Sequence, residues 1–227
     1  MNIMLNTLDT YNIVYIKGGI FMSITKRDRY VVNILDNHLK CATVQQINML
    51  PCFGKAPTVA SRRLKQLKEN GYLQRQMFEI IGNSYVYYST FLKYPPKELE
   101  HSLLMTDVYL ALLRTGYEII TFNIENYLYY TEKQKEKYII PDIMIVAKDP
   151  KGRIQKFFCE ICLDKKFEHI INKYNIYKTY YIPQISKGRN INPYELLLIS
   201  PVQRDVDGFC INTDINDIES FFKVLCM

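Results

Sequence analysis

Two carboxylates in the second half of this 227-residue sequence lie on segments with the pattern of adjacent strands. Asp142 precedes the apolar run IMIVAK, and Glu160 lies within FFCEICL. Between them stands DPKG (149–152), with Pro and Gly at the second and fourth positions of a β-turn, so we expect a hairpin. Residues two apart in a strand share a face, so this hairpin can bring both carboxylates to one Mg²⁺ or Mn²⁺ ion. Such an ion would activate water for attack on a phosphate ester.

This arrangement resembles the PD-(D/E)xK nuclease superfamily, which has the order helix, β-meander, helix, strand. Residues 98–200 show that order of patterns, and Pro141-Asp142 and Glu160 match the first two parts of the superfamily signature. The resemblance implies a lysine two residues after Glu160, where this chain has Cys162. A thiol carries no positive charge, so it cannot stabilise a negative transition state as a lysine would.

Lys165 and Lys166 follow at the start of the next predicted helix, and one geometry would bring Lys165 to the carboxylates. We therefore predict Asp142, Glu160 and Lys165 as candidate catalytic residues. Asp142 and Glu160 are also the candidate metal ligands, for Mg²⁺ or Mn²⁺. The competing interpretation is an acid in an exposed turn and a strand-end acid that faces solvent, without chemistry. Loss of the signature lysine favours a nuclease-like fold without activity.

The six cysteines are scattered along the chain and follow no secretory signal, which predicts reduced thiols in the cytoplasm. Cys159 and Cys162 form a C-x-x-C. However, strand positions three apart point to opposite faces, and no second Cys or His pair stands at zinc spacing. A zinc or redox site is therefore disfavoured. No apolar run is long enough to span a bilayer, so we expect no membrane contact.

The net charge of +6 is unevenly distributed. Residues 1–90 carry 11 Lys and Arg against 5 Asp and Glu, whereas residues 91–227 carry 18 of each kind. A basic part joined to a neutral part is typical of a protein that contacts phosphate with one end. The alternative is a domain whose basic face is merely solvated.

Helical periodicity predicts three helices in the basic part, over 25–39, 43–50 and 56–73. Thr25 and Thr43 are placed to cap the first two helices, and Gly71 is placed to end the third. Two β-rich runs follow, separated by the hairpin signal Gly82-Asn83.

Three helices followed by a β-hairpin resemble a winged helix-turn-helix domain, which places its third helix in the major groove and its hairpin along the DNA backbone. The segment SRRLKQLKENGYLQR (61–75) resembles the recognition helix and first wing strand of bacterial winged helices. The predicted DNA-binding residues are Ser61, Arg62, Arg63, Lys65, Lys68 and Arg75. Double-stranded DNA is the predicted partner, and no cofactor is required for its binding. Many winged helices bind protein instead.

Pro95-Pro96 interrupts regular structure, so we place a domain boundary there. Beyond it we predict a helix over 98–116, a strand over 117–124, and a polar loop or ragged helix over 125–137. The carboxylate hairpin, a helix over 164–181, a strand over 194–200 and a helix over 214–225 complete the pattern. The expected class is α+β, with a winged helix at 22–92 and a degenerate nuclease-like α/β domain at 98–227.

We interpret residues 1–21 as a leader or disordered segment. Lys17-Gly18-Gly19 can be encoded by a bacterial ribosome-binding sequence at a suitable distance before Met22, so we hypothesise that translation begins at Met22. The alternative is a short N-terminal strand, YNIVYI.

The whole pattern resembles the replication-relaxation family of bacterial plasmids and integrative conjugative elements, commonly of Firmicutes. The likeness covers residues 25–200. Beyond the winged-helix pattern, it rests on HSLLMTD (101–107), on Pro141-Asp142 with FCE (158–160), and on KYNIY (173–177). It implies a role in plasmid replication or in the relaxation of supercoiled DNA. We interpret His101 and Asp107, six residues apart on a predicted helix, as structural or interdomain contacts.

The sequence thus favours a DNA-binding accessory protein of a mobile element. Because one winged helix reads only a short half-site, a homodimer is expected, and replication or relaxase proteins are candidate partners. The first alternative is a metal-dependent DNA nickase or endonuclease. The second is a transcriptional regulator with a sensor domain, which requires an apolar cavity in residues 98–227.

Overall fold

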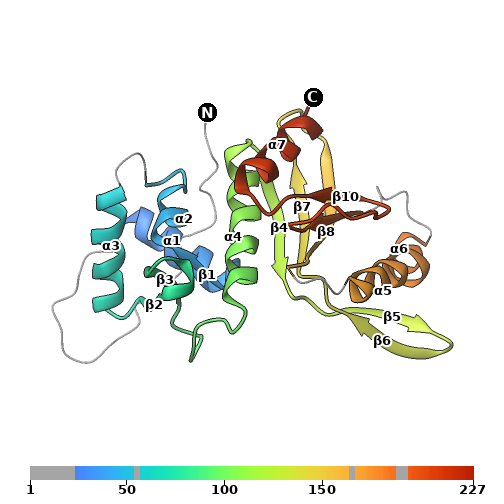
Figure 1. Cartoon of the computed structure of the whole chain (residues 1–227), viewed down its shortest axis with the longest axis horizontal. Helices are drawn as coiled ribbons and strands as arrows, with labels where there is room; N and C mark the ends of the chain where they lie inside the picture. Colours follow the sequence, from blue (N-terminus) through green and yellow to red (C-terminus); the bar gives the residue numbers. More distant parts are fainter. Residues whose placement is uncertain (1–23, 54–56, 164–166, 188–193) are drawn as a thin grey trace.

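The computed structural model describes residues 24–53, 57–163, 167–187 and 194–227 (Figure 1). The predicted leader and Lys165 lie outside these ranges. The fold is α+β, and the described residues form helices and three separate sheets. Within the described ranges, no helix combines the length and apolar character needed to cross a membrane.

The N-terminal part follows the predicted order of helices and hairpin. Its elements are α1 (Lys26–Asn37), β1 (Cys41–Thr43), α2 (Val44–Asn48), α3 (Pro57–Glu69), β2 (Leu73–Phe78) and β3 (Ser84–Ser89). The strands form an antiparallel sheet in the order β1-β3-β2. Thr25 and Thr43 cap α1 and α2 as predicted, and Gly71 adopts the left-handed conformation (φ 74°) after α3. The three-residue strand β1 is too short to show a sequence period and was not predicted.

A buried ion pair fastens α3 to α1. Asp28 is fully buried, and its carboxylate accepts from the guanidinium of Arg63 at 2.8 Å (Nε to Oδ1) and 2.5 Å (Nη2 to Oδ2). The same carboxylate caps the first turn of α1 through the backbone N–H of Thr25. Burial raises the pKa of Asp28, but these hydrogen bonds outweigh burial and hold the pKa below its ordinary value.

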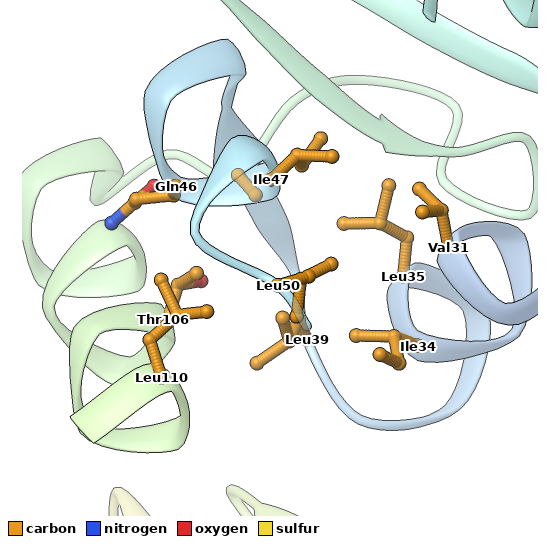
Figure 2. Close-up of a pocket in the computed structure, with 10 residues that line it drawn as sticks. Val31, Ile34, Leu35, Leu39, Gln46, Ile47, Leu50, Thr106 and Leu110 are labelled. Atoms are coloured by element: carbon orange, nitrogen blue, oxygen red, sulfur yellow. The ribbon is translucent and has the colours of Figure 1, made fainter. Parts of the chain in front are cut away.

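The helix α4 (Leu99–Arg114) stands between the N-terminal part and the main sheet (Figure 1). On one side, the Thr106 hydroxyl donates to the Cys41 carbonyl at 2.6 Å. The Gln46 amide donates to the Leu103 carbonyl at 2.9 Å and to the Asp107 carboxylate at 2.7 Å. Gln46 and Thr106 also line a small void between α4 and the N-terminal part, whose other walls are apolar (Figure 2).

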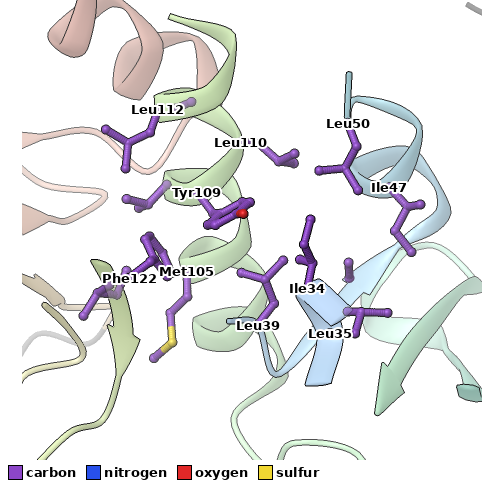
Figure 3. Packing of buried hydrophobic residues seen from close by; sticks show 14 of the residues in the cluster. Ile34, Leu35, Leu39, Ile47, Leu50, Met105, Tyr109, Leu110, Leu112 and Phe122 are labelled. Carbon is purple, nitrogen blue, oxygen red and sulfur yellow. The ribbon is translucent and has the colours of Figure 1, made fainter. Parts of the chain in front are cut away.

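The hydrophobic core continues through α4 without a break. Leu110 packs with the N-terminal residues Ile34 and Leu39, while the Tyr109 ring meets Phe122 of β4 edge-on, and Met105 and Leu112 belong to the same buried cluster (Figure 3). The core therefore does not divide at the prolines at 95–96, because α4 packs against residues from both sides of them.

The main sheet has five strands in the order β10-β9-β8-β7-β4. Their bounds are β4 (Glu118–Ile124), β7 (Ile143–Lys148), β8 (Ile154–Ile161), β9 (Glu195–Ile199) and β10 (Phe209–Ile211). The pairs β4–β7 and β7–β8 are antiparallel, and β8–β9 and β9–β10 are parallel. One face packs against α4 and α7 (Ile215–Leu225). The other face packs against α5 (Glu168–Ile176), which continues through a π-helical turn (Tyr177–Tyr181) into α6 (Ile182–Ser186).

The prediction of a loop or ragged helix over 125–137 is wrong, because this segment forms a hairpin of β5 (Leu128–Glu132) and β6 (Lys135–Ile139). Leu128, Tyr130 and Ile139 are buried against the π-helical region, and the charged residues around them are mostly exposed. The turn uses Lys133 and Gln134 at positive φ instead of Gly or Asn, so it carries no hairpin signal.

The ion pair between α1 and α3 predicts a difference between two adjacent arginines. Arg63→Ala leaves the buried Asp28 carboxylate without its counterion and should lower the free energy of unfolding by about 3 kcal/mol. Arg62→Ala removes an exposed side chain and should change stability by less than about 0.5 kcal/mol. Urea unfolding of the two variants measures the difference, and equal stabilities would contradict the structural role of Arg63.

Candidate functional site

Asp142 and Glu160 lie opposite one another at one end of the β7–β8 hairpin. Ile143 pairs with Cys159, so the antiparallel register sets Asp142, the residue before β7, across from Glu160. Glu160 is fully buried, and the Asp142 side chain is 15% exposed. Two carboxylates in such a setting repel each other, and neither is well solvated, so they require positive charge nearby.

Lys173 on α5 supplies this charge. Its Nζ lies 2.6 Å from Oε2 of Glu160 and 3.6 Å from Oδ1 of Asp142. Burial lowers the pKa of Lys173, but the two carboxylates outweigh this effect and hold the pKa above its ordinary value. The lysine predicted for this role, Lys165, lies outside the described residues.

Glu160 has a second partner from the same helical segment. The Tyr177 hydroxyl donates to Oε1 of Glu160 at 2.6 Å. Lys173 and Tyr177 are four residues apart, so both project from one face of the helix toward the sheet. The motif KYNIY already held this spacing, but the sequence did not reveal that it faces Glu160. Tyr177 also begins the π-helical turn, a deviation that often accompanies functional sites.

Asp142 has its own partners, from β8 and α4. Its Oδ2 accepts from the backbone N–H of Ile161 at 2.7 Å and lies 3.1 Å from Nε2 of His101 on α4. Burial raises the pKa of Asp142. The hydrogen bond from His101 and the charge of Lys173 outweigh burial and lower it. Burial also lowers the pKa of His101, but Asp142 outweighs this and raises it. His101 is therefore the residue through which α4 joins the carboxylate pair.

The pKa of Glu160 is raised to about 7, chiefly by burial and then by the negative charge of Asp142, with Lys173 and Tyr177 opposing. Glu160 thus changes charge near neutral pH, while Asp142 stays ionised. The two pKa values are driven apart because burial dominates at Glu160, whereas the hydrogen bonds and the nearby positive charge dominate at Asp142.

The donor atoms do not fit Mg²⁺ or Mn²⁺ in this arrangement. Each oxygen of Glu160 already accepts a hydrogen bond, and Oδ2 of Asp142 faces two partners. The remaining Oδ1 of Asp142 faces the Lys173 ammonium. Across the described residues, no group of three or more His, Cys, Asp or Glu side chains is placed to hold a metal ion.

Cys162 occupies the sequence position of the signature lysine, two residues after Glu160. It is buried with Ile170 and Leu198 beneath α5, on the same side of the sheet as Glu160. Cys159 packs on the opposite side, where burial raises its thiol pKa well above the ordinary value. Within the described ranges, none of the cysteines forms a disulfide.

A groove of about 420 Å³ borders the carboxylate network, with Tyr177 common to both. Aromatic rings dominate its walls: Phe158, Tyr174, Tyr177, Tyr194 and Phe209. Phe158 is stacked between Tyr177 and Tyr194, with ring centroids 4.5 and 4.3 Å apart. The volume falls in the range of small-molecule sites.

The residues predicted to bind DNA divide into two groups. Ser61, Arg62, Lys65 and Lys68 are exposed along α3. The other two are engaged within the protein. Arg63 turns inward and pairs with the buried Asp28 carboxylate. Arg75 on β2 lies over the Tyr85 ring at 4.3 Å.

Asp107, the second residue singled out in HSLLMTD, is the junction partner of Gln46. Burial raises its pKa to about 6, and the hydrogen bond from Gln46 opposes this. This is the structural contact between the two parts that the sequence predicted for it.

Comparison with known proteins adds little. No family model matches the chain, and no curated protein matches it. Among solved structures, the crystal structure of protein VC1899 from Vibrio cholerae is similar at 10% sequence identity and a TM-score of 0.38. The match covers 86% of this chain and 50% of that one, so this chain spans about half the length of VC1899. A likeness at this level carries no argument about fold or function.

The raised pKa of Glu160 predicts a pH dependence of stability. The unfolded chain releases this proton near pH 4.5, whereas the folded protein keeps it to about pH 7. Between these values the native state binds more protons, so rising pH favours unfolding. The stability of the wild type should therefore fall between pH 4.5 and about 7 relative to Glu160→Gln.

Chemical unfolding at several pH values measures this difference. His101 adds a decline of its own, but both proteins share it, so the difference isolates Glu160. Glu168→Gln, at an exposed position on α5, is the matched control and should follow the wild type. Parallel curves for wild type and Glu160→Gln would refute the assignment.

Proposed function

We propose that this chain binds duplex DNA through α3 and acts as an accessory protein of a bacterial mobile element. The observation that carries the proposal is the outer face of α3, where Ser61, Arg62, Lys65 and Lys68 are all exposed. The inner face of the same helix, formed by Ala60, Leu64 and Leu67, is fully buried. A rigid helix with a basic outer face suits the major groove of DNA.

The surrounding elements support a winged helix. The chain order α1-β1-α2-α3-β2-β3 and the strand order β1-β3-β2 match that architecture, in which β2 and β3 form the wing. Arg75 lies on β2, and its guanidinium packs over the Tyr85 ring and donates to the Tyr87 hydroxyl at 3.4 Å. A stacked arginine keeps its charge and can still contact a phosphate.

The charge distribution supports contact with the DNA backbone. The excess of positive charge falls in residues 1–90, the part that contains α3. Among the exposed α3 cations, Lys65 lies 3.8 Å from Glu69, a solvent-exposed pairing that contributes little and can be exchanged for phosphate.

The C-terminal part serves as a scaffold in this proposal. The strands β4, β7 and β8 with α5 and β9 follow the order expected of a nuclease-like domain, and the carboxylate pair is closed by Lys173. A homodimer would pair two half-sites, and replication or relaxase proteins remain the proposed partners. If the protein is instead a transcriptional regulator, the aromatic groove beside Tyr177 is where its ligand would bind.

The double variant Arg62→Ala/Lys65→Ala should weaken binding to duplex DNA from the region around its own gene by roughly tenfold or more, and should flatten the salt dependence. Fluorescence anisotropy across KCl concentrations measures both effects. Lys148→Ala/Lys223→Ala removes the same charge from exposed positions on β7 and α7, and should bind as the wild type. Binding that is absent or independent of salt would overturn the proposal.

A metal-dependent nickase is the second candidate, because a lysine stands beside two opposed carboxylates as in a nuclease site, although here that lysine takes the place of the ion. Such an enzyme would convert supercoiled plasmid to open circle with Mg²⁺ or Mn²⁺. Because Lys173 already pairs with Glu160, we expect no more nicking from the wild type than from Asp142→Ala. Metal-dependent nicking that is lost in Asp142→Ala would favour the enzyme.

A further inference from the structure

The carboxylate network brings together side chains from four separate elements. His101 comes from α4, Asp142 from the start of β7, Glu160 from β8, and Lys173 from α5, with Tyr177 following on the same helix. The Lys173 ammonium is the only one of these groups that lies within 4 Å of both carboxylates among the described contacts.

We propose that the Lys173 ammonium is the resident cation of a two-carboxylate site, in the place of a divalent ion, and that the native chain binds no divalent ion there. This inference rests on the geometry of the network and is independent of DNA binding through α3.

The charges in the site favour Lys173 over a divalent ion. An ammonium 2.6 Å from one carboxylate and 3.6 Å from the other neutralises much of their mutual repulsion. A divalent ion placed between the same oxygens would lie beside this ammonium, and two cations in a poorly solvated site repel strongly. Lysine and metal are therefore alternative occupants.

The hydrogen bonds of Glu160 also disfavour a divalent ion. Mg²⁺ demands oxygen ligands near 2.0–2.1 Å in octahedral geometry. Glu160 would have to give up Lys173, Tyr177 or both to become such a ligand, because each of its oxygens is already engaged. An ammonium accepts the geometry present and needs no dehydration of an ion from solution.

Lys173 is also covalently part of the site, because it belongs to α5. Lys173 is fixed by a helix whose neighbouring residues Ile170 and Tyr177 are buried against the sheet. Its ammonium is held at high effective concentration whatever the level of metal in solution. Removing it should leave two opposed carboxylates with a vacancy between them that a divalent ion from solution can fill.

The test is thermal unfolding of the full chain with and without millimolar MnCl₂ or MgCl₂. The wild type should show no ion-dependent shift beyond that of KCl at equal ionic strength. Lys173→Ala should melt roughly 6–12 °C lower without divalent ion and recover at least about half of the loss with Mn²⁺. Lys178→Ala, an exposed lysine on the same helical segment, is the matched control and should melt like the wild type without an ion response.

Two further variants keep the proposal falsifiable. Lys173→Ala/Asp142→Asn removes one of the two carboxylates and should lose the response to Mn²⁺. If Lys173→Ala does not fold, Lys173→Gln, which keeps a hydrogen-bond donor without the charge, replaces it in the same comparison. Direct titration of Mn²⁺ followed by electron paramagnetic resonance measures binding to the wild type. Wild-type binding that disappears in Asp142→Ala would overturn the proposal, as would a lysine variant that is stable and indifferent to Mn²⁺.

Discussion

The opposition of Asp142 and Glu160 is the constraint around which the C-terminal part is arranged. The β7–β8 register sets two acids face to face, with Glu160 fully buried, so the pair requires either a nearby cation or a proton on Glu160. The chain itself supplies this cation. The helix α5 lies over that end of the sheet, and its Lys173 side chain extends toward both carboxylates. His101 contacts Asp142 from α4, which lies on the face of the sheet opposite α5. The same carboxylate pair therefore also orients the first turns of α4.

Buried charge is handled in the same manner at the other end of the chain. Asp28 serves α1 as a cap and α3 as an anchor, with Arg63 as its counterion. Gln46 uses its carbonyl for the cap of α2 and its amide for α4. In each case one polar side chain satisfies a helix terminus and also a tertiary contact, so local and global structure depend on the same atoms.

Sequence patterns predicted the features that depend on local chemistry. The caps, the left-handed Gly71, the carboxylate hairpin and most helices follow from residue types at short spacing. The β5–β6 hairpin did not, because its turn uses Lys133 and Gln134 where a pattern search expects Gly or Asn. Arg62 and Arg63 look alike by charge, and only the buried partner Asp28 separates them, although the helical phase of Arg63, near Ala60 and Leu67, leans inward. Lys173 belongs to the motif KYNIY, but its role depends on how α5 packs across the sheet, which no sequence spacing encodes.

The continuity of the core through α4 bears on how such a chain can change over evolution. A boundary marked by prolines invites exchange of the segments on either side by recombination. Here the exchanged piece would carry an uncovered apolar surface, since Ile34, Leu39 and Leu110 pack as one cluster across that boundary. The donor and the recipient would need matching faces on α4. The two parts are therefore expected to be inherited together, and a mutation on either side of α4 is best compensated on the other.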